Sequence, residues 1–259
     1  MLSLSFLLIA HLYFYVGPVQ ATEQEERSFQ IQVDEQDINV ICLDSTGNEA
    51  FKIAIRKNGG IDEITVQYLP FINSGGWFVW RDDWNQIGAD VMSEPIIQNM
   101  GDYIIVTCFG RYLVHPFKLV TNITICKTGI IFIHSTLTAE NATATENIAW
   151  GFWGLPEDAW KDSKVYAYID GKPVQEIVLP ASHPVGQYSI WSGSDTLWMD
   201  LSKQLSGITI ISLAPQYFSA GEICDERDYS PVFSCRFTLA GGNAFGKGEA
   251  RIANVAMYI

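Results

Sequence analysis

The chain has 259 residues, of which 48% are hydrophobic, so it can bury a sizeable core. Its 29 acidic residues outnumber its 16 basic ones, which gives a formal net charge of −13. This balance excludes broad contact with nucleic acid, because neutralising phosphates requires Lys and Arg. It also argues against adsorption to anionic lipid. A neutral ligand, a cation or a basic partner fits the composition better.

The first segment of the chain is almost wholly apolar, from residue 2 to residue 16, and ends at Gly17-Pro18. A helix needs roughly 20 apolar residues to span a bilayer, so this run is short for a membrane anchor. Val19-Gln20-Ala21 has the small residues that a signal peptidase reads. We therefore expect residues 1–21 to be a signal peptide of a secreted or cell-surface protein. An uncleaved anchor is the alternative, because no Lys or Arg precedes the apolar run.

Residues 22–259 predict a single domain, because they contain no Pro/Gly/Ser-rich linker, no repeat of fixed period and no second apolar stretch long enough to cross a membrane. Within this domain, Phe51, Ile53 and Ile55 alternate with less apolar residues, as in a strand with one buried face. Asn58-Gly59 follows and predicts a type I′ turn, with the partner strand over 61–66. This pattern is typical of a β-hairpin.

Two further hairpins are predicted downstream. Residues 119–126 and 130–137 flank Lys127-Thr128-Gly129, and residues 164–169 and 174–179 flank Asp170-Gly171. No long segment has the 3.6-residue period of a helix, and only residues 156–161 suggest a helical turn. The chain is therefore predicted to be all-β, a large antiparallel β-sandwich. Further strands are expected at 28–33, 37–43, 103–109, 187–191, 206–213, 232–239 and 249–258.

The mature chain would keep five cysteines, and disulfides persist outside the cytosol. Cys224 and Cys235 flank a loop of charged and turn residues, which favours a disulfide between them. Cys108 and Cys126 lie in neighbouring predicted strands and could form a second one, leaving Cys42 free. No Cys/His spacing typical of zinc appears.

Two glycosylation sequons, Asn122-Ile123-Thr124 and Asn141-Ala142-Thr143, are candidate modification sites in an exported protein. On the predicted strand 119–126, Asn122 would lie on the opposite face from Leu119 and Ile125. The sequence therefore predicts that the first sequon points outward.

Aromatic and charged side chains are concentrated over residues 77–85. Trp80 and Trp84 could stack on a pyranose while Arg81 hydrogen-bonds its hydroxyls. Asp82 and Asp83 could bind hydroxyls or act as acid and base. The alternative is that the tryptophans pack in the core and that Arg81 pairs with a carboxylate on a surface loop.

A second aromatic cluster spans residues 150–160. Trp150, Trp153 and Trp160 could be platforms for a sugar ring, with Glu157 as an acid. The alternative is a core strand followed by a helical turn, in which Glu157 and Asp158 only favour the helix N-terminus.

Two further candidates lie near the C-terminal third of the chain. His183 precedes Pro184, which indicates a loop, and it is also a catalytic candidate. Asp225, Glu226 and Asp228 offer hard oxygen ligands at short spacing, which could hold calcium, although their spacing matches no EF-hand. A solvated acidic loop is the alternative. No other cofactor is expected.

Four segments together resemble the galactose-mutarotase-like β-supersandwich proteins: the opening 59–64, the long strand 128–141, the segment 146–155 and the closing 245–249. The resemblance implies a supersandwich whose concave sheet carries a sugar ligand. The segment 147–153 lacks the histidine that mutarotases place there. The resemblance therefore bears on the fold more than on an activity.

The residues and the resemblance together favour a carbohydrate-binding or carbohydrate-processing protein. A structural or adhesive surface protein is the first alternative, in which every Trp is a core or interface residue. A sugar epimerase or polysaccharide lyase is a further alternative.

Overall fold

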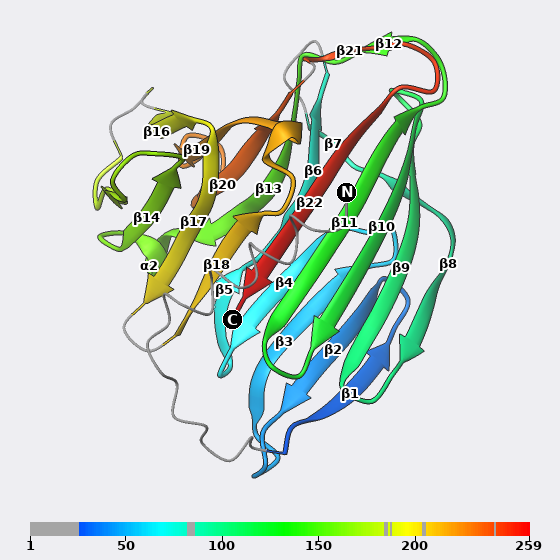
Figure 1. Cartoon of the computed structure of the whole chain (residues 1–259), viewed down its shortest axis with the longest axis vertical. Helices are drawn as coiled ribbons and strands as arrows, with labels where there is room; N and C mark the ends of the chain where they lie inside the picture. The colour runs from blue at the N-terminus through cyan, green and yellow to red at the C-terminus, as the bar shows by residue number, and fades with distance from the viewer. Residues whose placement is uncertain (1–25, 82–85, 184–185, 187, 204–205, 241) are drawn as a thin grey trace.

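The computed structural model describes residues 26–81, 86–183, 186, 188–203, 206–240 and 242–259. The predicted signal peptide and the candidates Asp82, Asp83 and Trp84 lie outside these residues. Two large antiparallel sheets dominate the described part and lie one over the other (Figure 1). The prediction of an all-β sandwich is therefore confirmed.

The larger sheet has eleven strands among the described residues, and β13 lies near its middle. Its main path runs β1 (Ser28–Val33), β2 (Asp37–Leu43), β3 (Glu49–Arg56), β4 (Ile61–Val66), β6 (Gly75–Trp80), β13 (Asn147–Pro156), β20 (Val232–Leu239), β19 (Phe218–Asp225) and β16 (Ser189–Ser194). Two short strands extend it: β5 (Leu69–Ile72) pairs with β4, and β7 (Gln86–Ile87) pairs with β6.

The second sheet has nine strands, and the last strand of the chain lies inside it. Its order is β15 (Gln175–Val178), β14 (Lys164–Ile169), β17 (Thr196–Lys203), β18 (Ser206–Ser212), β22 (Ala250–Tyr258), β11 (Ile130–Ala139), β10 (Phe117–Cys126), β9 (Tyr103–Tyr112) and β8 (Asp90–Asn99). The short strands β12 (Thr143–Ala144) and β21 (Ala244–Phe245) form a separate ribbon at the top of Figure 1. The described helices are α2 (Glu157–Trp160) and the 3₁₀ turn η1 (Pro215–Tyr217).

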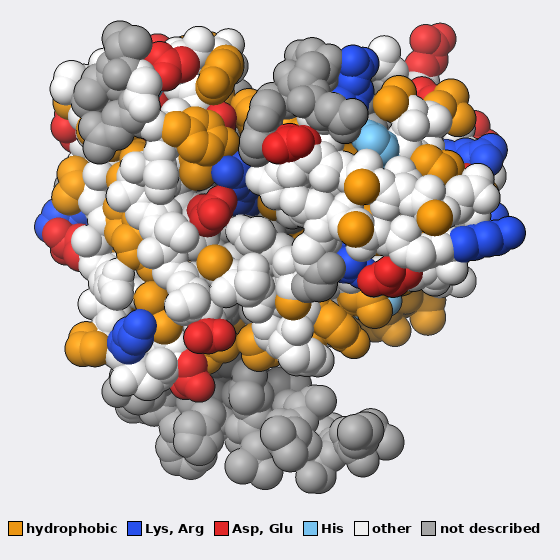
Figure 2. Space-filling view, turned by 90° about the horizontal axis from the view of Figure 1, so that it is seen from above, with side chains coloured by type: hydrophobic (Ala, Val, Ile, Leu, Met, Phe, Trp, Pro, Cys, Tyr) orange, Lys and Arg blue, Asp and Glu red, His pale blue; other side chains and the backbone are white. Residues whose placement is uncertain are grey.

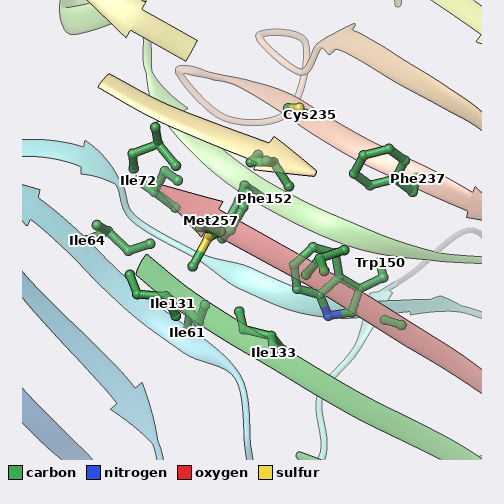
Figure 3. Packing of buried hydrophobic residues seen from close by; sticks show 14 of the residues in the cluster. Ile61, Ile64, Ile72, Ile131, Ile133, Trp150, Phe152, Cys235, Phe237 and Met257 are labelled. Atoms are coloured by element: carbon green, nitrogen blue, oxygen red, sulfur yellow. The ribbon is translucent and has the colours of Figure 1, made fainter. Parts of the chain in front are cut away.

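The core lies between the two sheets, where alternate side chains of each strand meet. On β10, Leu119, Ile123 and Ile125 are buried while Asn122 on the other face is partly exposed, as the alternation predicts. Figure 3 shows Trp150 and Phe152 of the larger sheet packed with Ile133 and other aliphatic side chains of the smaller one. On β10, the two-residue period therefore determines which side chains enter the core.

The hairpin of β3 and β4 is confirmed, but its turn is not type I′. Only Gly59 has a positive φ, of 97°, and Asn58 does not. The Gly59 amide donates to the Arg56 carbonyl, and the Arg56 amide donates to the Gly60 carbonyl. This is the three-residue loop with a glycine bulge, the next most common hairpin connection.

The two predicted disulfides are wrong, because all five cysteines are free thiols. In the β19–β20 register Cys224 lies opposite Ser234, and Ile223 lies opposite Cys235. Cys224 and Cys235 are thus offset by one residue and point to opposite faces of the sheet.

The pairing of Cys108 with Cys126 fails for a different reason. Cys108 lies opposite Thr121, whereas Cys126 lies opposite Tyr103 at the far end of the same strand pair. Strands rise roughly 3.4 Å per residue, so these sulfurs are far beyond bonding reach.

Among the residues that the structure describes, no helix is long and apolar enough to span a membrane.

Candidate functional site

The candidate site lies on the outer face of the larger sheet, across β6, β13, β20 and β19. Trp77 and Val79 of β6 point into the core, so Phe78 and Trp80 point to the other face, where they form a separate buried cluster with Ala149. The register places the side chains of alternate residues from the four strands in rows across this face.

One of these rows crosses β13 and β20 at a point where the two backbones lie close together. It runs from Gly76 through Gly151 and Arg236 to Glu222. A Cβ on Gly151 would lie 2.4 Å from the Arg236 Cα and 2.4 Å from the Cys235 carbonyl oxygen. Glycine at position 151 is therefore what allows β20 to carry Arg236 so close to β13.

Arg236 lies between two aromatic rings on this face, and only 7% of its side chain is exposed. Its guanidinium carbon is 5.2 Å from the Trp80 ring centre and 5.4 Å from the Tyr188 ring centre. Nε donates to Glu222 Oε2 at 2.8 Å, and Nη1 donates to the Tyr188 hydroxyl at 2.8 Å. Arg236, Tyr188 and Glu222 thus form one hydrogen-bonded group, and the Trp80 ring packs against its guanidinium.

Glu226 adds a buried carboxyl to the same group, with no exposed surface. Its Oε1 accepts hydrogen bonds from the Tyr188 hydroxyl at 2.9 Å and from Ser234 Oγ at 2.6 Å. Its Oε2 is buried and has no hydrogen-bond partner among the described residues. Burial raises the pKa of Glu226 and of Tyr188, which favours the protonated form of both groups.

An open groove of about 460 Å³ lies on this face at the end of β13. Trp153 lines it and is only partly buried, with its ring 5.7 Å from Phe78 and 6.5 Å from Trp80. A supported indole beside polar groups is a suitable surface for a ligand with apolar and hydroxyl faces. The groove is lined by Asn73, Ser74, Trp153, Gly154, Pro156, Glu157, Asp158, Ser230, Pro231 and Val232.

Glu157 is held at the edge of this groove by two anchors. The first is α2, which begins at Glu157 and whose Trp160 indole is buried and donates to the Phe71 carbonyl at 3.0 Å. The second is Arg227, whose Nη1 donates to Glu157 Oε1 at 2.9 Å. The Glu157 side chain remains 32% exposed.

Arg227 also holds Asp225, through Nε and Nη2 at 2.8 and 2.7 Å. His183 lies beside the same carboxylate, with Nδ1 3.0 Å from Asp225 Oδ2, and its Nε2 is 2.7 Å from Asp228 Oδ1. The hydrogen bonds with Asp228 and then Asp225 raise the pKa of His183. Although burial raises the pKa of Asp225, the hydrogen bonds from Arg227 and His183 outweigh it and lower that pKa.

The calcium site considered from the sequence is not formed by these side chains. Asp225 and Asp228 face Arg227 and His183, whereas Glu226 turns toward Tyr188. Within the described ranges, no group of three or more His, Cys, Asp or Glu side chains is arranged to hold a metal ion.

The tryptophans predicted to bind ligand separate into different environments. Trp150 and Trp160 are fully buried in the core, so no ligand reaches them there. This agrees with the alternative of a core strand followed by a helical turn. Trp80 is buried under Arg236, and Arg81 is exposed at the end of β6. Among the described candidates, Trp153 and Glu157 line the same groove.

Two sequons differ in their surroundings. Asn122 is partly buried, and its Oδ1 accepts a hydrogen bond from Thr107 Oγ1 at 2.8 Å. Asn141 is exposed in a bend of the chain between β11 and β12.

Sequence reasoning missed Arg236 and Tyr188, because each is a single polar residue in or beside a separate strand. The only local signal was Arg236 in the otherwise apolar or small-residue run 232–239.

Figure 2 shows the molecule from above relative to Figure 1. Lys and Arg side chains are scattered among acidic and neutral ones on the face shown there, and they form no continuous basic patch on it.

No protein-family model matches the sequence, and no curated protein matches it. Solved structures with similarity include galactose 1-epimerase from Lactobacillus acidophilus, at 8% identity and a TM-score of 0.46, over 91% of this chain and 98% of that one. Another is the GalM/aldose epimerase homologue from C. elegans, at 8% identity and a TM-score of 0.39, over 90% and 98%. Both TM-scores are below 0.5, so no property of either protein is carried over to this chain.

Proposed function

We propose that this protein binds a carbohydrate in the groove at the end of β13. The observation that carries the proposal is Trp153, a partly exposed indole supported from beneath by Phe78 and Trp80 and bordered by Glu157 and further polar residues. The indole offers an apolar face to a pyranose ring, and the carboxylate accepts hydrogen bonds from its hydroxyls.

The charges around the groove fit a neutral or hydroxyl-rich ligand. Glu157 is paired with Arg227, and the exposed Asp158 is 3.2 Å from Lys161 Nζ. Neither carboxylate is therefore left as an isolated charge, and hydrogen bonding rather than net charge would select the ligand.

Titration of tryptophan fluorescence with four linear tetrasaccharides, of glucose, xylose, galactose and mannose, tests the proposal. We expect at least one to bind the native protein, and the Trp153→Ala variant to bind it about tenfold more weakly. The matched control is Trp198→Ala, which removes a partly exposed indole from the opposite sheet, where it stacks on Tyr168. If none of the four tetrasaccharides changes the tryptophan fluorescence, the structural or adhesive alternative is favoured.

A second candidate function, acid–base catalysis on a sugar, is favoured by one observation. Glu226 is a buried carboxyl with a raised pKa. It accepts a hydrogen bond from the Tyr188 hydroxyl, which in turn accepts one from Arg236. Burial favours the protonated form of this carboxyl, which can therefore act as a proton donor. Polarimetry of reducing sugars and absorbance of unsaturated products would reveal catalysis, and Glu226→Gln should abolish it.

We also propose that the protein is exported, with residues 1–21 removed. The apolar run followed by small residues supports this, and the exposed Asn141 is the better placed of the two sequons for a glycan.

A further inference from the structure

Arg227 lies beside the groove and has several protein partners, and its side chain is 4% exposed. It donates to both carboxylate oxygens of Asp225, to Glu157 Oε1, and to the carbonyls of Ala181 and Ser182 at 3.2 and 3.1 Å. Its guanidinium carbon lies 4.6 Å from the centre of the Phe233 ring. The planar donor fork is thus fixed from several directions at once.

Only one of these partners lines the groove. Asp225 is 1% exposed, whereas Glu157 is partly exposed and belongs to the groove wall. Arg227 uses Oε1 of Glu157, and Oε2 has no hydrogen-bond partner among the described residues. The contact therefore fixes the carboxylate through one oxygen and leaves the second as an acceptor.

We infer that Arg227 is a positioning residue for the groove: it presents Glu157 Oε2 to a hydroxyl or ammonium hydrogen of the bound sugar. The inference rests on the proposed carbohydrate site. Arg227 itself does not line the groove, so it acts on the ligand through Glu157. A hydrogen bond to a carboxylate held in one orientation is stronger than one to a freely rotating carboxylate, because less side-chain entropy is lost on binding.

A double-mutant cycle tests this directly, with the tetrasaccharide of lowest Kd from the panel above as the probe. We expect Glu157→Gln and Arg227→Lys each to raise Kd about tenfold, because each removes or releases a charge-assisted hydrogen bond. Once Glu157 is Gln, adding Arg227→Lys should raise Kd less than about twofold, because the two residues act through one contact. Equal effects of Arg227→Lys in both backgrounds would show a merely structural role and overturn the inference.

A second variant keeps the test independent of Arg227. Glu157→Asp retains the charge but withdraws the carboxylate from Arg227, and it should weaken binding about as much as Glu157→Gln. Full binding by Glu157→Asp would overturn the inference while leaving the carbohydrate site intact. The matched control is Lys164→Met, which removes an exposed ion pair with Glu176 on the nine-stranded sheet, outside the groove lining, and should leave Kd unchanged. If the native protein binds none of the four sugars, the proposed function and this inference both fail.

Discussion

His183 bridges two carboxylates, and its protonation is therefore linked to folding. Asp228 and Asp225 raise its pKa above the usual 6.5, so the folded state binds the proton more tightly than the unfolded chain does. The stabilisation is complete below the unfolded pKa and is lost as pH rises through the raised folded pKa. The lowered pKa values of Asp225 and Asp228 keep both carboxylates ionised through this range.

Replacing His183 by Gln should consequently lower Tm at about pH 5.5 and have a smaller effect at about pH 9. Thermal unfolding followed by circular dichroism at several pH values measures this difference. The variant His134→Gln, on the outer face of the nine-stranded sheet without an acidic partner in hydrogen-bond contact, is the control. A difference between native and His183→Gln that does not change with pH would contradict the linkage.

At the scale of elements, the contact of β13 with β20 decides the geometry of the site. A Cβ at position 151 would meet backbone atoms of β20, which cannot move aside as a flexible side chain can. We therefore expect Gly151→Ala to lower the free energy of unfolding by about 1–3 kcal/mol, since the strands must separate. It should also displace Arg236.

Urea unfolding of Gly151→Ala measures that cost. The control is Gly88→Ala, where an added Cβ has no atom within 4 Å and the backbone φ is not positive. This control should change the free energy of unfolding by less than about 0.5 kcal/mol. Equal stability of the two variants would mean that β13 and β20 tolerate a wider spacing than the structure has.

At the scale of the whole molecule, the thiols are protected by the sandwich. Burial raises the pKa of Cys108 and of Cys224 to about 12, so both remain protonated and unreactive at neutral pH. We expect a thiol assay on the purified, denatured protein to count five free thiols, and reducing agent to leave Tm unchanged. A count of three or fewer would show that a disulfide forms after all.

The sequence predicts local features of this molecule well. Each predicted hairpin joins neighbouring segments, and the two-residue period on β10 identifies its buried face. Segment 147–156 is different, because it is apolar on both faces and alternation cannot tell which side of the sheet each residue occupies. Trp150 points into the core, whereas Trp153 lines the groove next to a bulge.

Only part of the candidate site could be predicted from the sequence, which offers Trp80, Trp153 and Glu157 as candidates. The cluster that Arg236 forms with Tyr188 and Glu222 over Trp80 exists only because β13 lies between β6 and β20. No local pattern specifies which distant strands become neighbours in a large antiparallel sheet.

The placement of β22 has a consequence for how the protein folds. β22 contains residues 250–258, and it lies between β11 and β18 rather than at an edge. The two parts of the nine-stranded sheet are therefore joined through a strand that lies far from β11 in the sequence. We expect this sheet to be completed slowly, because pairing such distant segments closes long loops.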